Sequence, residues 1–262
     1  MEYRNLLFTI EDRICKVTLN RPDLHNAMNR ALLDELRTAF EAVAQMERGQ
    51  VRAVVLSGAG KSFCAGADIN WMRASLDYSE EENVADALAL ARTFESIDKC
   101  PVPVIARIHG AALGGGVGLA AVADIVVAAD NAKFAFSEAK LGIAPAVISP
   151  YVLAKIGRSH ARALFFTAER FGAERALKIG LVHIVVASDA LDGEVDRLVS
   201  ELKSSGPTAI ARAKILIATV STLSPDDAMQ YTAETIAALR VSPEGQEGLH
   251  AFLEKRKASW AE

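Results

Sequence analysis

The sequence contains few cysteines and no long tract of basic residues. Its three cysteines, Cys15, Cys64 and Cys100, lie far apart and form no CxxC pair. So sparse and odd a set argues against a disulfide scaffold and for a reducing compartment. The 29 basic and 33 acidic side chains give a formal net charge of −4. Without a basic tract, nucleic acid is not expected as the main partner.

The chain also lacks a long apolar run. The longest uncharged run covers residues 108–123 and contains five glycines, whereas a membrane-spanning helix needs about 20 apolar residues. Near the N-terminus only residues 6–10 form an apolar stretch before Glu11 and Asp12, which is too short for a signal peptide. We therefore expect no membrane association and a soluble, cytoplasmic protein.

The sequence does contain enough apolar residues for a large core. Of its 262 residues, 51% are apolar, so the chain can fold as one large domain or as a core with an appendage. Apolar residues recur at helical spacing over residues 30–48 and 81–97, and short apolar runs lie before, between and after these segments. We expect two helices there and strands at residues 6–10, 14–19, 51–56, 103–108 and 125–128.

The alternation of strands and helices indicates an α/β fold. The first two strands are expected to pair as a hairpin, and the later crossovers should give a parallel sheet that is covered on both faces. From Pro150 onward the pattern changes to almost continuous helix. Ser224 and Ser242 each precede a proline and acidic residues, which is typical of helix starts. We expect an α/β core over about residues 1–200 and a helical region over about 201–262.

Two loops rich in small residues follow predicted strands. The first, residues 57–69, contains Gly60-Lys-Ser62, but valine at position 55 breaks the phosphate-loop pattern. The second, residues 110–119, places Leu119 where a dinucleotide fingerprint needs glycine. Each loop alone could be a tight turn with close packing. Both together favour two backbone N–H groups that converge on one ligand oxygen.

Glu138 is the candidate for acid–base chemistry. It lies in the mostly apolar segment 134–145, where burial would raise the pKa of its carboxyl group toward values useful for proton transfer. Taken alone, a solvated surface glutamate is the simpler interpretation. The five histidines show no H-x-x-x-H or H-E-x-x-H spacing, so we expect no metal site.

Four motifs occur in order along the chain: Phe63-Cys-Ala-Gly-Ala-Asp-Ile69, Gly110-Ala-Ala-Leu-Gly-Gly-Gly116, Ala123-Asp-Ile-Val-Val-Ala128 and Phe136-Ser-Glu-Ala-Lys-Leu-Gly142. As an ordered set, together with Asn20-Arg-Pro22 and Asn26-Ala27, they resemble the crotonase superfamily, the enoyl-CoA hydratase/isomerase family. Residues 251–257 extend the resemblance over essentially the whole chain. It implies a repeated ββα spiral core and a C-terminal helical region that forms homotrimers, often paired into hexamers.

The resemblance implies an acyl-CoA thioester as the substrate and no separate cofactor, because coenzyme A enters as part of the substrate. The backbone N–H groups of Ala67 and Gly115 would hold the thioester carbonyl, and Glu138 would transfer protons beside it. By motif position, further residues would bind the substrate: Leu24, Ala65, Asp68, Ile69, Gly114, Phe252 and Lys255. In the family, the last two positions often reach the coenzyme A of a neighbouring subunit.

One position sets this chain apart from the best-known hydratases of the family. They carry a second glutamate in the helix after the glycine run, where this chain has Gly118. With Glu138 alone, hydration of a 2-enoyl-CoA, migration of its double bond and hydrolysis of a thioester are all open. So is a catalytically silent CoA-ester-binding protein. Residues 141–152 resemble bacterial hydratases of branched esters such as 3-methylglutaconyl-CoA, so we expect hydration in leucine or fatty acid degradation.

Overall fold

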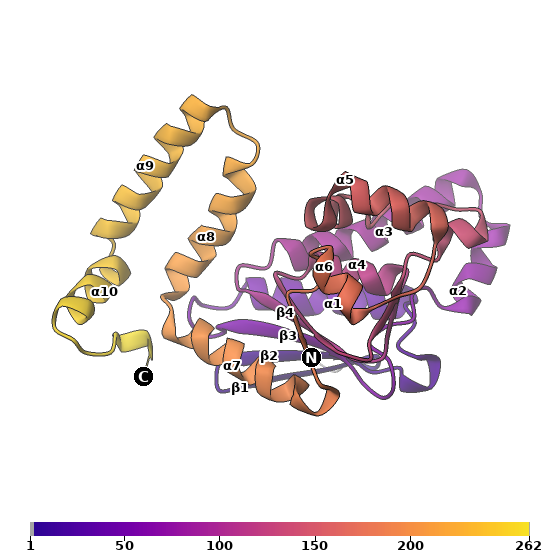
Figure 1. Ribbon diagram of the computed structural model, residues 1–262, viewed down its shortest axis with the longest axis horizontal. Helices are drawn as coiled ribbons and strands as arrows, with labels where there is room; N and C mark the ends of the chain where they lie inside the picture. The colour runs from indigo at the N-terminus through magenta and orange to yellow at the C-terminus, as the bar shows by residue number, and fades with distance from the viewer. Residues whose placement is uncertain (1–2, 262) are drawn as a thin grey trace.

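The computed structural model describes residues 3–261, and its main element is a six-stranded β-sheet (Figure 1). β1 and β2 form the predicted antiparallel hairpin, and every other neighbouring pair of strands in this sheet is parallel. The α/β class is therefore confirmed. In spatial order the strands are β1 (Leu6–Glu11), β2 (Ile14–Leu19), β3 (Ala53–Gly58), β4 (Val104–Ile108), β6 (Ile125–Ala129) and β9 (Ile184–Val186).

Three short strands, which lie along the chain between the later strands of the main sheet, form a second sheet. It consists of β5 (Ala111–Leu113), β7 (Lys133–Ala135) and β8 (Phe171–Gly172). β5 and β7 are parallel, and β8 pairs antiparallel with β7. These strands are too short to show an alternating pattern, so the sequence did not predict them. They are nevertheless the elements that bring the candidate site together.

Helices cover the main sheet on both faces, as the sequence predicted. On β3, Val54 and Leu56 belong to the larger core, whereas Ala53 and Val55 belong to a smaller one that includes Leu191. This split follows from the geometry of a strand, in which successive side chains point to opposite faces. Three helices cover the larger core: α1 (Arg30–Ala44), α3 (Glu80–Asp98) and α4 (Gly115–Val122). The smaller core lies under α7 (Leu191–Ser204).

The prediction of almost continuous helix after Pro150 is wrong in part. The two helices α5 (Ser149–Thr167) and α6 (Ala173–Lys178) are separated by β8, and β9 then completes the edge of the main sheet. A run of three apolar residues is too short to separate a strand from a helix by its period. Helix α1 also ends four residues earlier than predicted, before a turn in which Gly49 has a φ of +89°.

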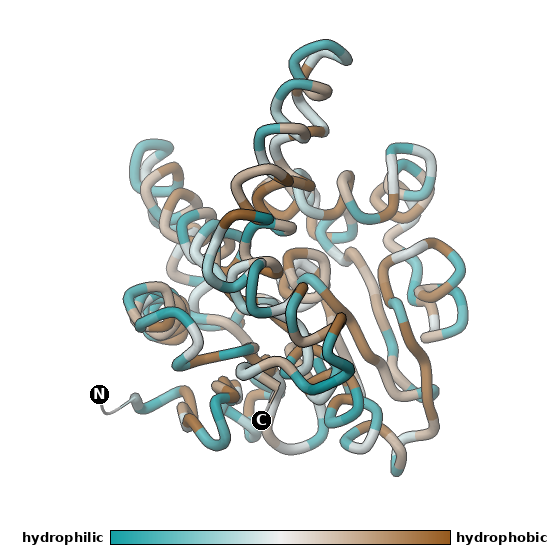
Figure 2. Tube along the Cα trace, turned by 90° about the vertical axis from the view of Figure 1, so that its left-hand side faces the viewer, coloured by the Kyte–Doolittle hydropathy of each residue, from teal (hydrophilic) through white to brown (hydrophobic). Residues whose placement is uncertain are grey.

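Three helices at the C-terminal end form an arm that projects from the core (Figure 1). Ser224 and Ser242 cap the second and third of them, accepting hydrogen bonds from the N–H groups of Asp227 and Gly245, so both predicted helix starts are confirmed. No residue of the first two is buried, and apolar turns recur along the arm where it faces the viewer in Figure 2. The arm consists of α8 (Pro207–Val220), α9 (Pro225–Val241) and α10 (Pro243–Leu253).

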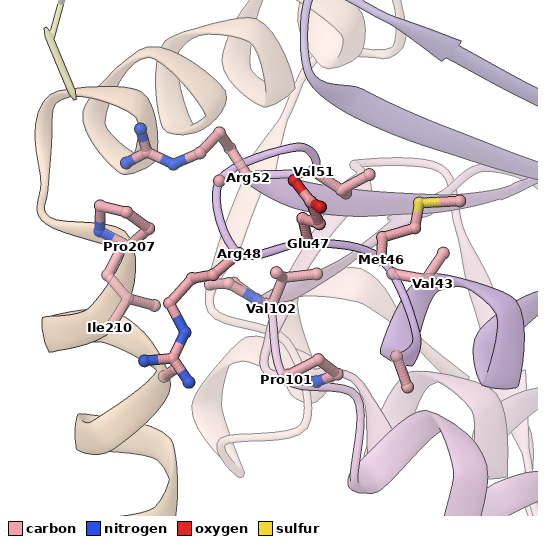
Figure 3. Close-up of a pocket in the computed structure, with 14 residues that line it drawn as sticks. Val43, Met46, Glu47, Arg48, Val51, Arg52, Pro101, Val102, Pro207 and Ile210 are labelled. Atoms are coloured by element: carbon pink, nitrogen blue, oxygen red, sulfur yellow. The ribbon is translucent and has the colours of Figure 1, made fainter.

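Arg52 fastens the base of this arm to the core. Its side chain is 2% exposed and donates hydrogen bonds to the carbonyl oxygens of Leu202, at 2.9 Å, Ser205 and Trp260. Beside it, a cavity of about 190 Å³ separates the end of α1 from Pro207 and Ile210 (Figure 3). None of the candidate site residues lines this cavity. Within residues 3–261, no helix is long and apolar enough to span a bilayer.

Candidate active site

Three segments that are distant in the sequence lie side by side at the candidate site. Cys64 donates its N–H to the oxygen of Ala111 at 3.0 Å and accepts from the N–H of Leu113 at 2.9 Å. The small-residue loop after β3 therefore runs beside β5, and β5 in turn pairs with β7. Gly114 follows β5 and Glu138 follows β7. Since both parallel strands end at the same edge, the two glycine-rich loops and the glutamate meet there.

The backbone N–H groups of Ala67 and Gly115 are free to bind a ligand. Among the hydrogen bonds of residues 3–261, neither group is a donor. Gly115 begins α4, where the first N–H groups have no partner within the helix and the helix dipole is positive. Gly114 precedes it with φ +50° and ψ −120°, a conformation that strongly favours glycine. The turn thus presents an unpaired N–H at a residue that has no side chain of its own.

Glycine is also required where the two loops touch. A β-carbon added at Gly66 would lie 2.9 Å from the oxygen of Leu113, and one added at Gly116 would lie 2.2 Å from the oxygen of Cys64. Both contacts are backbone atoms that cannot swing aside. The high glycine content of these loops therefore reflects their close approach, which also brings the segment containing Ala67 next to the start of α4.

The carboxyl group of Glu138 lies beside this turn. A β-carbon at Gly114 would be 3.3 Å from its Oε1 atom. Its Oε2 atom is buried, and no side chain or backbone group among residues 3–261 hydrogen-bonds to it. Burial raises the pKa of this carboxyl above its ordinary value of 4.5. A carboxyl with one buried, unpaired oxygen is costly for stability, which is typical of a functional group.

The position of the missing second glutamate is filled by apolar side chains. Gly118 lies one helical turn after Gly114 in α4. A β-carbon added there would be 2.3 Å from Cγ2 of Ile148 and 3.0 Å from Cε1 of Phe94. The space directly beside a β-carbon at position 118 is therefore occupied by Ile148 and Phe94.

Neither Asp68 nor Asp98 replaces this second acid. Asp68 caps α2 (Ile69–Ala74) and accepts a hydrogen bond from Arg21 at 2.7 Å. Burial alone would raise the pKa of Asp68, but the hydrogen bonds from Arg21 and from the N–H of Asn70 outweigh it and lower the pKa. Asp98 lies near Asp124, which follows the other end of α4. An eight-residue helix is about 12 Å long, so Asp98 is remote from Glu138.

The remaining predicted substrate-binding residues fall into two groups. The first group lies around the small-residue loop and consists of Leu24, Ala65 and Ile69. Ala65 donates its N–H to the oxygen of His25, which follows Leu24. Ile69 begins α2 and has an exposed side chain. Phe252 and Lys255 instead lie at the end of the arm, far from α2 and α4 in Figure 1. The structure of one chain does not bring these two residues to the site.

Cys64 is enclosed within the loop and is not a reactive thiol. Its side chain is fully buried, and this burial raises the pKa of the thiol to about 12, far from the range of catalytic cysteines. His109 donates a 2.9 Å hydrogen bond from Nε2 to the carbonyl oxygen of Gly60, which fits a packed histidine at a strand end. In the described part of the chain, no three His, Cys, Asp or Glu side chains are placed to hold a metal ion.

Asn26 belongs to the family resemblance, but the sequence did not predict that Asn26 and Met28 hold the loop in place. The buried side chain of Asn26 donates to the oxygens of Ala59 and Ser62 at 2.8 and 2.7 Å, and Met28 pairs with the loop on both sides of Ala67. The sequence signal for this role is the short run Asn26-Ala-Met28 after Asn20-Arg-Pro22. None of the side chains in this run is typical of catalysis. Its importance appears only once the chain has folded.

Residues 9–262 match the enoyl-CoA hydratase/isomerase family. The chain is 35% identical to the crotonyl-CoA hydratase of Syntrophomonas wolfei over 262 residues, covering 99% of both proteins. Its structure is similar to that of an enoyl-CoA hydratase from Shewanella pealeana, with a TM-score of 0.94, 39% identity and coverage of 99% and 97%. It is also similar to Pseudomonas aeruginosa AtuE, with a TM-score of 0.95, 37% identity and coverage of 99% and 100%.

Proposed function

Since the chain belongs to the enoyl-CoA hydratase/isomerase family, we propose that it adds water across the double bond of a 2-enoyl-CoA thioester. The observation that carries this proposal is the buried, unpaired Oε2 atom of Glu138 beside the turn at Gly114. A carboxyl in this state is free to take and return a proton. The two unpaired N–H groups of Ala67 and Gly115 supply the complementary function, since they can bind the carbonyl oxygen of the thioester.

In the proposed reaction a single carboxylate acts twice. Glu138 takes a proton from a water molecule as the water oxygen bonds to the β-carbon of the substrate. The electrons of the double bond move onto the thioester, and the resulting enolate oxygen is held by the N–H groups of Ala67 and Gly115. Glu138 then returns the proton to the α-carbon. Each fixed donor of this kind typically contributes about 3–4 kcal/mol to the stability of the transition state.

A branched substrate such as 3-methylglutaconyl-CoA is the more specific part of the proposal. It is supported by the resemblance of residues 141–152 to bacterial hydratases of branched esters. A role in leucine degradation follows only if this substrate is preferred.

A panel of CoA esters tests the function. We expect crotonyl-CoA and 3-methylglutaconyl-CoA to lose the absorbance of the conjugated thioester and to gain the mass of one water, with the branched ester turned over faster. A product of unchanged mass with a moved double bond would indicate an isomerase instead, and free coenzyme A would indicate a hydrolase. If no ester of the panel reacts but all bind, the protein is a CoA-ester-binding module and the proposal is wrong.

We further propose that the arm mediates assembly into a homotrimer or hexamer, in which Phe252 and Lys255 reach the coenzyme A of a neighbouring subunit. The support is that α8 and α9 bury no residue, while the arm exposes apolar side chains such as Phe252, which is 80% exposed. Sedimentation equilibrium should give three or six times the 28.0 kDa chain mass. A monomer at micromolar concentration would contradict this.

A further inference from the structure

We infer that Met28 is the positioning residue of the oxyanion site, fixing the N–H groups of both Ala67 and Gly115. This inference rests on the proposed function, in which those two groups bind the thioester oxygen. Met28 is 1% exposed and lies between the two loops. It contacts one donor segment through its backbone and the other through its side chain, so it does not need to touch the substrate.

The backbone of Met28 sets the orientation of Ala67. The N–H of Met28 donates to the oxygen of Gly66 at 2.7 Å, and the oxygen of Met28 accepts from the N–H of Asp68 at 2.8 Å. In an extended segment, successive residues present their polar groups to opposite sides. Because the residues on either side of Ala67 are bonded to Met28, the N–H of Ala67 faces away from Met28 and stays available to a ligand.

The side chain of Met28 supports Gly115. A β-carbon built on Gly115 would lie 2.2 Å from the terminal methyl carbon of Met28. The methyl group thus fills the place of a side chain at Gly115 and packs directly against its backbone. As Gly115 is the first residue of α4 and follows the turn at Gly114, this contact limits how far its N–H can shift.

The segment that carries Met28 is itself held firmly. The guanidinium group of Arg21 bonds to the oxygen of Ala27 and to the carboxylate of Asp68, and the carboxylate of Asp68 caps α2. The side-chain amide of Asn26 is buried and bonds the loop through Ser62. The backbone of Met28 is therefore held in one position, and the contact of its side chain with Gly115 restricts the position of Gly115 as well.

Truncating this side chain should lower the rate of the reaction in addition to the stability of the fold. Met28→Ala removes the contact beneath Gly115 but keeps the two backbone hydrogen bonds that flank Ala67. A shift of about 1 Å at a group that must meet the transition state can cost up to about 100-fold in rate. We expect Met28→Ala to lower kcat by about 10- to 100-fold with little change in KM, and Met28→Leu, which conserves volume, to restore most of the rate.

Binding of two unreactive ligands isolates the oxyanion site. Butyryl-CoA has the thioester carbonyl, whereas butyl-CoA, its thioether, lacks it. The unaltered protein should bind butyryl-CoA more tightly, and Met28→Ala should reduce this preference at least threefold. Leu36→Ala, at an equally buried position on α1, is the matched control. It should lower the melting temperature without changing kcat or the preference for the carbonyl.

The outcomes separate this inference from the proposed function. If Met28→Ala keeps both the wild-type kcat and the wild-type carbonyl preference while losing thermal stability as Leu36→Ala does, Met28 is only a core residue and the inference is wrong. If the unaltered protein neither prefers the thioester to the thioether nor turns over any enoyl-CoA, the proposed function and the inference fall together.

Discussion

Replacing Glu138 by glutamine is expected to lower kcat by about 100- to 10,000-fold, the usual contribution of a positioned acid–base group. Glutamine has the same shape but cannot take a proton from water or return one to the α-carbon. In two-carboxylate sites, a second acid can carry part of this work. Here Gly118, Ile148 and Phe94 occupy that place, and Asp68 is held by Arg21, so the loss should lie at the upper end of the range.

The measurement is the initial rate of crotonyl-CoA hydration, paired with binding of butyryl-CoA. The unpaired N–H groups of Ala67 and Gly115 are main-chain atoms that the substitution leaves in place, so the dissociation constant should change less than threefold. Glu82→Gln, on the exposed start of α3, is a control that should leave the rate unchanged. A Glu138→Gln variant that retains more than a tenth of the wild-type rate would remove Glu138 from the mechanism.

The melting temperature of the same variant will distinguish a loss of activity from a loss of folding. Because burial raises the pKa of Glu138, the folded protein holds a proton that the unfolded chain has already released, between pH 4.5 and the raised pKa. Folding stability therefore falls as the pH rises through this interval, and the cost of the buried carboxylate is complete above it. Glutamine carries no such charge. Glu138→Gln should melt at a higher temperature than the wild type at pH 7.5, and the difference should disappear below about pH 4.5.

The sequence predicted the residues of the site better than their surroundings. The two small-residue loops and the lone acid in apolar company are visible in one dimension, whereas Ala67 and Gly115 were singled out, and Glu138 was assigned its role, by the resemblance to the family. The strands β5 and β7 that bring them together are three residues each, and no pattern of that length separates a strand from a turn. Their pairing depends on contacts between distant segments.

The supporting residues were invisible for a different physical reason. Met28 and Ile148 are ordinary apolar residues whose sequence neighbours predict only burial. What matters is that each lies against a glycine of α4, Met28 against Gly115 and Ile148 against Gly118. Such complementarity between a side chain and a missing side chain can be recognised only in three dimensions. The substitution of glycine for glutamate at position 118 was evident from the resemblance, but its structural consequence was not.

Alanine at position 118 is expected to destabilise the protein, although the same change in an ordinary helix is stabilising. Replacing a glycine in a helix interior by alanine usually adds about 0.5–1 kcal/mol of stability. Here the new β-carbon would lie 2.3 Å from Cγ2 of Ile148, and overpacking of this kind costs about 1–3 kcal/mol. We expect Gly118→Ala to lower the free energy of unfolding by about 1–2 kcal/mol, measured by urea denaturation.

Glutamate at the same position should be worse, and it should not restore a two-carboxylate site. Gly118→Glu adds the cost of an unpaired carboxyl in apolar surroundings to the overpacking, so we expect a loss of about 3 kcal/mol or more and no gain in hydration rate. In an Ile148→Ala background, where Cγ2 is absent, the additional cost of Gly118→Ala should shrink, since the two positions are in contact. A stabilised Gly118→Ala variant would show that the space beside Gly118 is open. A faster Gly118→Glu variant would show that a second carboxyl group can take part in the reaction.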